Sequence, residues 1–217
     1  MWAVLWKDLR LEFRTKERVS SLFVLALLIV LVFVFALSPE HAQGPEVAAA
    51  LLWVTLLFAG MFSMQRAFLI EQERGCLSGL LLCPFEPSTL FLAKLLGNVL
   101  FLVLVQAAVT PITLLFLGVR FSWALLGLPL VLLLGIIGFS ALGTLVAAMA
   151  VRTRAREVLL PLMLLPLLVP LLIAAVKVTG ALLAGAPWTG VWLRVLLAFD
   201  VIFVVTGWLI FAHVVQE

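Results

Sequence analysis

Few residues in this sequence are of the types that do chemistry, and their spacing matches no catalytic motif. The sequence contains no GxxxxGK[ST] phosphate loop, no HExxH zinc motif and no GxSxG nucleophile. Cys76 and Cys83 are seven positions apart, which is neither a CxxC redox pair nor a haem-attachment motif. His41 and His213 fall in segments that the topology places on opposite sides of a membrane, so they cannot share a metal. We therefore expect a non-catalytic chain that holds no metal or cofactor of its own.

One group of polar residues lies inside a long apolar segment. Gln106, Thr110 and Thr113 fall within about 60° of one another on a helix, and Asn98 lies on the same side. Such residues either hold helices together by hydrogen bonds or line a pathway through the membrane.

Asp200 is the single acid inside a predicted span, near its outer end. It follows Arg194 by six residues. A charged group at that depth must pair, reach the interface or face water. Asp200 is therefore expected either to bond Arg194 or the segment before it, or to form part of an outer gate.

The longest polar interruption of the chain is the stretch 71–94. It carries three acids and two bases and is expected to form two short helices, broken at Gly79 and Pro84, along the inner membrane face. Its leucine-rich face beside acids suits a groove on a soluble partner. The alternative is a surface hairpin without a partner.

The composition requires a membrane to surround these residues. The chain has 217 residues, 65% of them hydrophobic and 12% charged, with a mean hydropathy of +1.31. Apolar runs of about 20 residues match a bilayer core of roughly 30 Å. The runs are continuous rather than alternating, which argues against a β-barrel. The formal charge of +3 gives no reason to expect nucleic-acid binding. The fold class is an all-α polytopic membrane protein.

One permease-type domain, 1–217, is expected to contain six spans. An interfacial amphipathic helix, 1–18, would place Trp2 and Trp6 in the lipid boundary and Arg10 and Arg14 toward headgroups. A re-entrant segment of short helices is expected at 177–192, after a bent, proline-containing fifth span. The predicted spans are 19–37, 47–65, 89–118, 123–151, 158–176 and 193–215.

The distribution of basic residues sets the orientation. With six spans and the N-terminus inside, 11 of the 14 Lys and Arg residues fall on the inner side and 3 on the outer side. The positive-inside rule then makes both termini cytoplasmic. Trp53 is one of four tryptophans that this topology places near the outer interface. Small residues at Gly143, Thr144, Ala147 and Ala148 predict close helix packing, either within the chain or across a dimer.

The polar stretch resembles the CcmB family of haem exporter permeases from bacterial cytochrome c maturation. The N-terminal KDLRLEFR at 7–14 and MQRAF at 64–68 are also similar to that family. The residues that carry the resemblance are Glu71, Glu73, Gly75, Leu77, Leu80, Leu81, Leu82, Pro84 and Lys94.

The resemblance implies an ABC-2 type permease in the bacterial cytoplasmic membrane, with 71–84 as a coupling helix. Its partners would be the ATPase CcmA, which binds ATP and magnesium, a second copy of the chain, CcmC, CcmD and, indirectly, the haem chaperone CcmE. Haem would be cargo, or ATP hydrolysis would release the haem-loaded chaperone. The alternatives are an ABC-2 permease for a lipid, glycan or drug, and a membrane assembly scaffold without transport.

Overall fold

Helices make up all regular structure in the described part of the chain, which a computed structural model gives for residues 16–36, 44–73, 87–119, 123–150 and 156–216. The elements are α2 (Lys16–Ala36), α4 (Pro45–Glu73), α6 (Pro87–Phe116), the 3-10 helix η1 (Trp123–Gly127), α7 (Leu128–Ala150), α8 (Arg156–Leu183) and α9 (Val191–Gln216).

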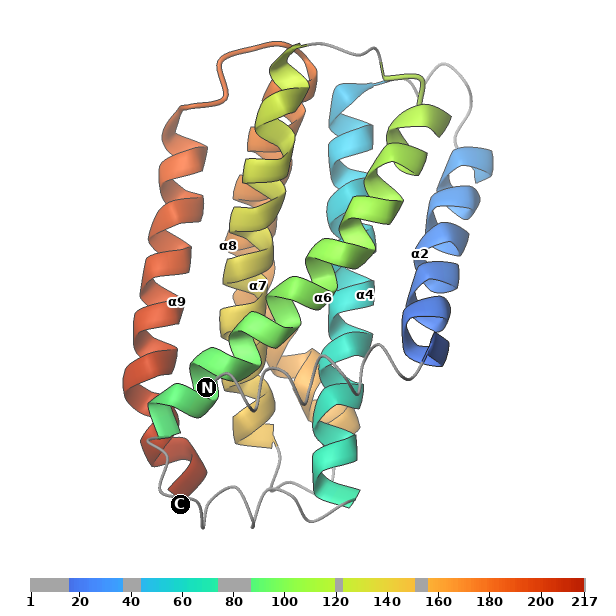
Figure 1. Ribbon diagram of the computed structural model, residues 1–217. Coiled ribbons are helices and arrows are strands. Elements are labelled where there is room, and N and C mark those ends of the chain that lie inside the picture. Colours follow the sequence, from blue (N-terminus) through green and yellow to red (C-terminus); the bar gives the residue numbers. More distant parts are fainter. Residues whose placement is uncertain (1–15, 37–43, 74–86, 120–122, 151–155, 217) are drawn as a thin grey trace.

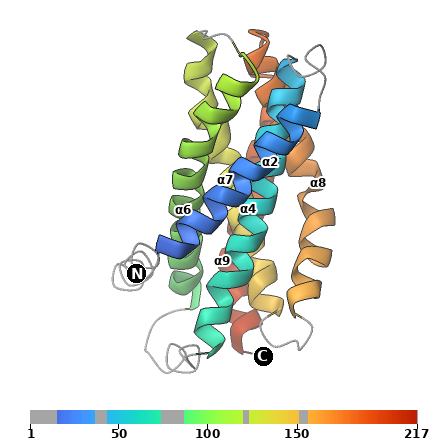
Figure 2. The ribbon, with the colours of Figure 1, turned by 90° about the vertical axis from the view of Figure 1, so that its right-hand side faces the viewer.

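Helix α7 is the centre of the bundle. It packs against α4, α6, α8 and α9, whereas α2 lies at one edge, where it packs mainly against α4 and α6. Figure 1 shows α6 crossing the bundle obliquely, from beside α9 at its beginning toward α2 at its end. Figure 2 shows α2 lying across α4 and α6. The central place of α7 explains why most of its side chains are buried.

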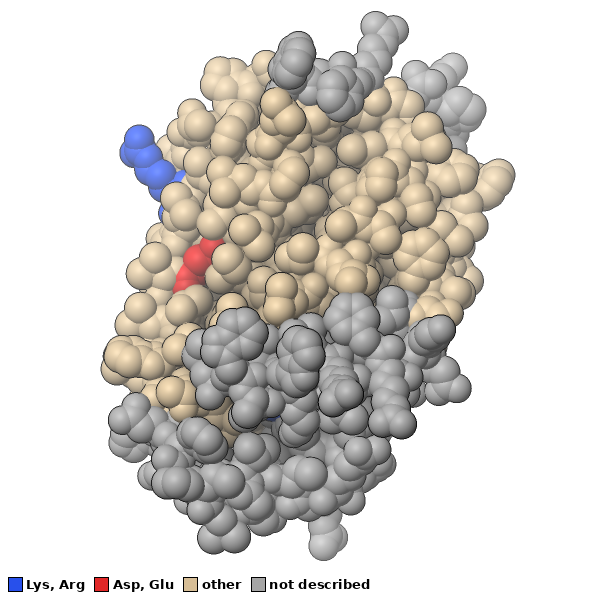
Figure 3. Space-filling model, in the orientation of Figure 1, with Lys and Arg blue, Asp and Glu red and all other residues tan. Residues whose placement is uncertain are grey.

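The bundle has the composition of a membrane domain. Among the described residues, five helices are long and apolar enough to cross a bilayer, and Ser20–Ala36 of α2 is a shorter apolar helix. The face in Figure 3 is almost entirely uncharged where it is described, with small basic and acidic areas at one side. The five segments are Pro45–Gln65, Ser88–Phe116, Leu125–Ala150, Leu159–Leu183 and Val191–Phe211.

The prediction of a re-entrant segment of short helices at 177–192 is wrong for the residues that belong to α8. This helix continues without interruption to Leu183, so Lys177–Leu183 form its last turns rather than a short re-entrant helix. The reason is that Val178 and Leu182 extend the buried stripe of this helix. Only the residues from 184 to 190 form turns and irregular backbone.

The three prolines of α8 leave it a single helix. Pro166 and Pro170 are exposed, while Leu164, Leu168 and Leu171 are fully buried. At Pro166 and Pro170, the backbone positions that lose a hydrogen bond therefore lie at the face directed away from the bundle.

Two predicted elements lie wholly or partly outside the described residues. The interfacial helix with Trp2, Trp6, Arg10 and Arg14 is one of them. Of the predicted coupling segment, Glu71 and Glu73 belong to the last turn of α4 rather than to a separate helix. The rest lies outside the described residues, namely Gly75, Leu77, Leu80, Leu81, Leu82 and Pro84.

Candidate functional site

The interior of the bundle contains a set of buried polar side chains among apolar ones. Because the environment offers little water, each of these groups needs a partner inside the protein. Most of those with a partner use it to join two helices. The set comprises Thr55, Ser63, Asn98, Gln106, Thr110, Thr113, Ser140, Thr144, Thr179 and Asp200.

Asn98 connects three helices. Its Nδ2 donates to Thr144 Oγ1 of α7 at 3.2 Å and to Met64 Sδ of α4 at 3.3 Å. Gln106, two turns further along α6, donates from Nε2 to the Leu52 carbonyl of α4 at 3.5 Å. These two side chains make the hydrogen bonds between helices that one of the two sequence interpretations expects.

The remaining members of the predicted stripe are also buried. Thr113 Oγ1 donates to the Val109 carbonyl of its own helix at 3.0 Å. Thr110 Oγ1 is buried and has no hydrogen-bond partner in the described part of the chain. Gln106, Thr110 and Thr113 thus lie together inside the bundle, and their possible role in a pathway stays a prediction.

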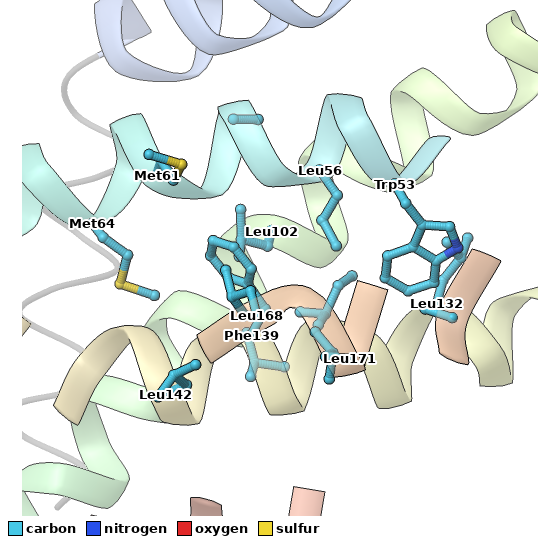
Figure 4. Close-up of a cluster of buried hydrophobic side chains, with 14 of the residues drawn as sticks. Trp53, Leu56, Met61, Met64, Leu102, Leu132, Phe139, Leu142, Leu168 and Leu171 are labelled. Atoms are coloured by element: carbon cyan, nitrogen blue, oxygen red, sulfur yellow. The ribbon is translucent and has the colours of Figure 1, made fainter. Parts of the chain in front are cut away.

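Trp53 is not the interfacial anchor that the sequence suggests. It is only 1% exposed, and its Nε1 donates to Thr179 Oγ1 of α8 at 2.9 Å. The indole fits against Gly135 of α7, where a methyl group would overlap the ring. Figure 4 shows Trp53 directed from α4 into the interior, beside Leu132. A single tryptophan therefore joins α4, α7 and α8.

The hydrogen bond between Trp53 and Thr179 should be measurable as a coupling energy. In a double-mutant cycle of Trp53→Phe and Thr179→Val, we expect about 0.6 kcal/mol of coupling, the average for hydrogen bonds between membrane helices. The measurement is the free energy of unfolding by denaturing detergent in mixed micelles. Thr113→Val is the control, since that hydroxyl bonds only its own helix. Strict additivity of Trp53→Phe and Thr179→Val would contradict the bond.

Asp200 is buried inside the bundle. It is the tenth residue of α9, about 13 Å from Val191 along the helix axis. Its side chain is 6% exposed, and neither carboxylate oxygen has a hydrogen-bond partner among the described residues. The expected bond to Arg194 is therefore wrong: six residues correspond to a rotation of about 120°, and Arg194 is exposed.

The glycines of α7 decide between the two interpretations of its small residues. Gly135 accommodates Trp53 of α4, and Gly138 accommodates the Asp200 carboxylate of α9. At Gly143 a methyl group would come within 3.1 Å of Met64 Cε. The small side chains Thr144, Ala147 and Ala148 are buried as well. All of these residues pack against other helices of the same chain. They are therefore not available on the surface for a dimer interface, and the packing is within the chain.

Sequence reasoning missed four participants of the polar interior, each of them a single hydroxyl in an apolar run. Nothing in the spacing of Thr55, Ser63, Ser140 and Thr179 separates them from ordinary helix residues. Trp53 and Gly135 offered a signal only as a pair, because a buried tryptophan next to a helix requires a small residue opposite its ring.

Comparisons with known proteins identify the family of this chain. A sequence model of the family "CcmB protein" matches residues 1–217. Heme exporter protein B of Pseudomonas aeruginosa is 32% identical over 197 residues, which cover 90% of this chain and 88% of that protein. Heme exporter protein B of Rhodobacter capsulatus is 31% identical over 197 residues, which cover 85% of this chain and 90% of that protein. Heme exporter protein B of Bradyrhizobium diazoefficiens is 26% identical over 205 residues, which cover 94% of this chain and 92% of that protein. The chain belongs to the CcmB family.

Proposed function

We propose that this chain is the membrane permease subunit of a haem-export complex, and not a catalyst. The observation that carries the proposal is the CcmB family match over the whole length, 1–217, on a bundle of long apolar helices. Relatives that cover most of the chain bear the name heme exporter protein B. The buried polar interior supports it, because hydrogen bonds between helices fix the packing of a membrane bundle.

The proposed topology has six spans in the bacterial cytoplasmic membrane, with both termini in the cytoplasm. Helix α2 is the first span, since its apolar residues Ser20–Ala36 continue from the basic N-terminal region. The excess of Lys and Arg in the segments on the proposed inner side supports this orientation.

The energy for export comes, in this proposal, from a partner ATPase of the CcmA type. The sequence contains no phosphate loop, so ATP must act through another chain. The segment 71–84 is the proposed contact, because it joins the end of α4 to the beginning of α6. Force applied there would reach two helices that Asn98 and Gln106 tie together. A nucleotide can shift the packing only through such a differential contact.

The coupled step is haem export or the release of a haem-loaded chaperone of the CcmE type. We favour mechanical coupling over a haem site within this chain. The complex would contain a second copy of the chain and subunits of the CcmC and CcmD type. Purification of the native complex, with mass spectrometry for subunits and absorption spectroscopy for haem, tests this composition. An isolated chain with neither ATPase nor haem would contradict it.

The coupling segment is tested by substitution in its acidic beginning and in its leucine-rich part. We expect Leu80→Asp, or Glu71→Lys with Glu73→Lys, to weaken ATPase binding about thirtyfold, as loss of about 2 kcal/mol at a docking hot spot would. The measurements are co-purification of the ATPase and cytochrome c maturation in the host.

The matched control for the coupling segment is Glu46→Lys. Glu46 is an exposed acid in the first turn of α4, at the other end of the same helix as Glu71 and Glu73. It should leave ATPase recovery unchanged. Wild-type recovery and maturation in the Leu80→Asp variant would refute the assignment of 71–84.

A further inference from the structure

Asp200 is a buried acid whose neighbours offer it no charge. Helix α9 packs against α6, α7 and α8, and α7 contains no ionisable residue over its whole length. Both carboxylate oxygens are buried and without a hydrogen-bond partner in the described ranges. The surroundings on α9 include Phe199 and Phe203, whose rings pack in a tilted arrangement at 4.4 Å between centroids and 41° between planes.

The cations whose side chains are described on these helices are either exposed or have an interaction partner. Lys177 of α8 and Arg194 of α9 are exposed. Lys94 of α6 has its own interaction partner. Neither carboxylate oxygen of Asp200 accepts a hydrogen bond from Lys94, Lys177 or Arg194. No described cation therefore compensates the charge of an ionised carboxyl group through a hydrogen bond.

The carboxyl group occupies a slot made for it by a glycine. A methyl group at Gly138 would overlap Asp200 Oδ1, and it would also meet the Leu171 side chain of α8. The walls of the slot are thus the backbone of α7 and an apolar side chain of α8. The fit shows that this position of the carboxyl group is part of the packing at the seam between α7 and α9.

The charged form of a carboxyl group is poorly suited to this slot. An ionised carboxylate without a cation or hydrogen-bond donors is among the most costly arrangements inside a protein, and more so inside a membrane. The neutral acid avoids most of that cost. Any movement that separates α9 from Gly138 and admits water would reverse the preference, because water solvates the carboxylate.

We propose that Asp200 is a proton-binding site of the membrane domain. Its carboxyl group keeps its proton while α9 packs against Gly138, and it releases the proton to water when this seam opens. Opening would happen during the ATP-driven cycle, so this half of the inference rests on the proposed permease function. The protonated resting state depends on the packing alone.

The sequence allows an unusually direct test, because it has only two aspartates, Asp8 and Asp200. Full-length protein with isotope-labelled aspartate is placed in lipid bilayers and studied by infrared spectroscopy at neutral pH. We expect an isotope-sensitive C=O stretching band of a protonated carboxyl group. It should persist in Asp8→Asn and disappear in Asp200→Asn. Spectra with carboxylate bands alone for both aspartates would overturn the proposal.

The Asp8→Asn protein keeps the test valid even where Asp200→Asn fails to fold. In that variant Asp200 is the single aspartate, so the labelled bands report its protonation state without any change to the seam. A protonated band supports the proposal, and a carboxylate band rejects it.

The second half is tested by exchange into heavy water. In the resting protein the proton of Asp200 should exchange slowly, because its oxygens are buried. When the complex with its ATPase hydrolyses ATP, we expect exchange to accelerate at least about tenfold. Unchanged exchange during measured ATP hydrolysis would show that the seam stays closed, which rejects the opening step. Absence of any ATPase partner would instead count against the proposed function.

Discussion

Replacing Gly135 by alanine is expected to destabilise the bundle by about 3 kcal/mol, the upper part of the range for overpacked cores. A methyl group there overlaps the Trp53 ring. The ring cannot turn away freely, because its Nε1 is bonded to Thr179 at 2.9 Å and the side chain is fully buried. The contact between α4, α7 and α8 must therefore loosen. The free energy of unfolding in mixed micelles measures the effect.

Gly97→Ala is the matched control on α6. Gly97 is also a buried glycine inside a helix, yet nothing lies within 4 Å of a methyl group at that position. Alanine favours the helix by roughly 0.5–1 kcal/mol over glycine, so this variant should be neutral or more stable. Equal stability losses at Gly97 and Gly135 would mean that the slot for Trp53 does not set the cost.

The contrast between these two glycines shows what the sequence can and cannot predict. Long apolar runs and the charges between them are sufficient to predict helices close to α4, α6, α7 and α9, since spanning a bilayer fixes both length and composition. The extent of α8 could not be predicted in this way. Lys177 and Gly180 look like the end of a span, but the buried residues beyond them continue the helix.

The predictions for Trp53 and Asp200 failed because the position of a residue along its helix does not determine whether its side chain is buried inside the bundle. Trp53 and Asp200 are residue types that belong at an interface, and both were expected near one. In the structure each is directed into the bundle against a glycine of α7, Gly135 or Gly138. Which helix faces which glycine depends on the packing of all the helices together. The pairs of Trp53 with Gly135 and of Asp200 with Gly138 therefore cannot be predicted from the amino-acid sequence alone.

The second large effect is expected at the seam between α7 and α9. A side chain at position 138 would occupy the space that the Asp200 carboxyl group fills. Gly138→Ala alone should cost about 2 kcal/mol, since the new methyl group displaces the carboxyl group. Asp200→Ala alone should cost less, because it removes a buried acid without partners along with its packing. In the double variant the methyl group of residue 138 enters the space that the carboxyl group vacates. We therefore expect a favourable coupling of at least about 1 kcal/mol.

Gly143→Ala provides the reference for this cycle. It adds the same methyl group to the same helix, but there it meets Met64, an unbranched side chain that can adjust. Gly143 lies about 7 Å from Gly138 along the axis and faces α4 rather than α9. Its effect should add to that of Asp200→Ala within about 0.5 kcal/mol. If both cycles are additive, Asp200 does not rest against Gly138, and the closed seam that would hold its proton does not exist.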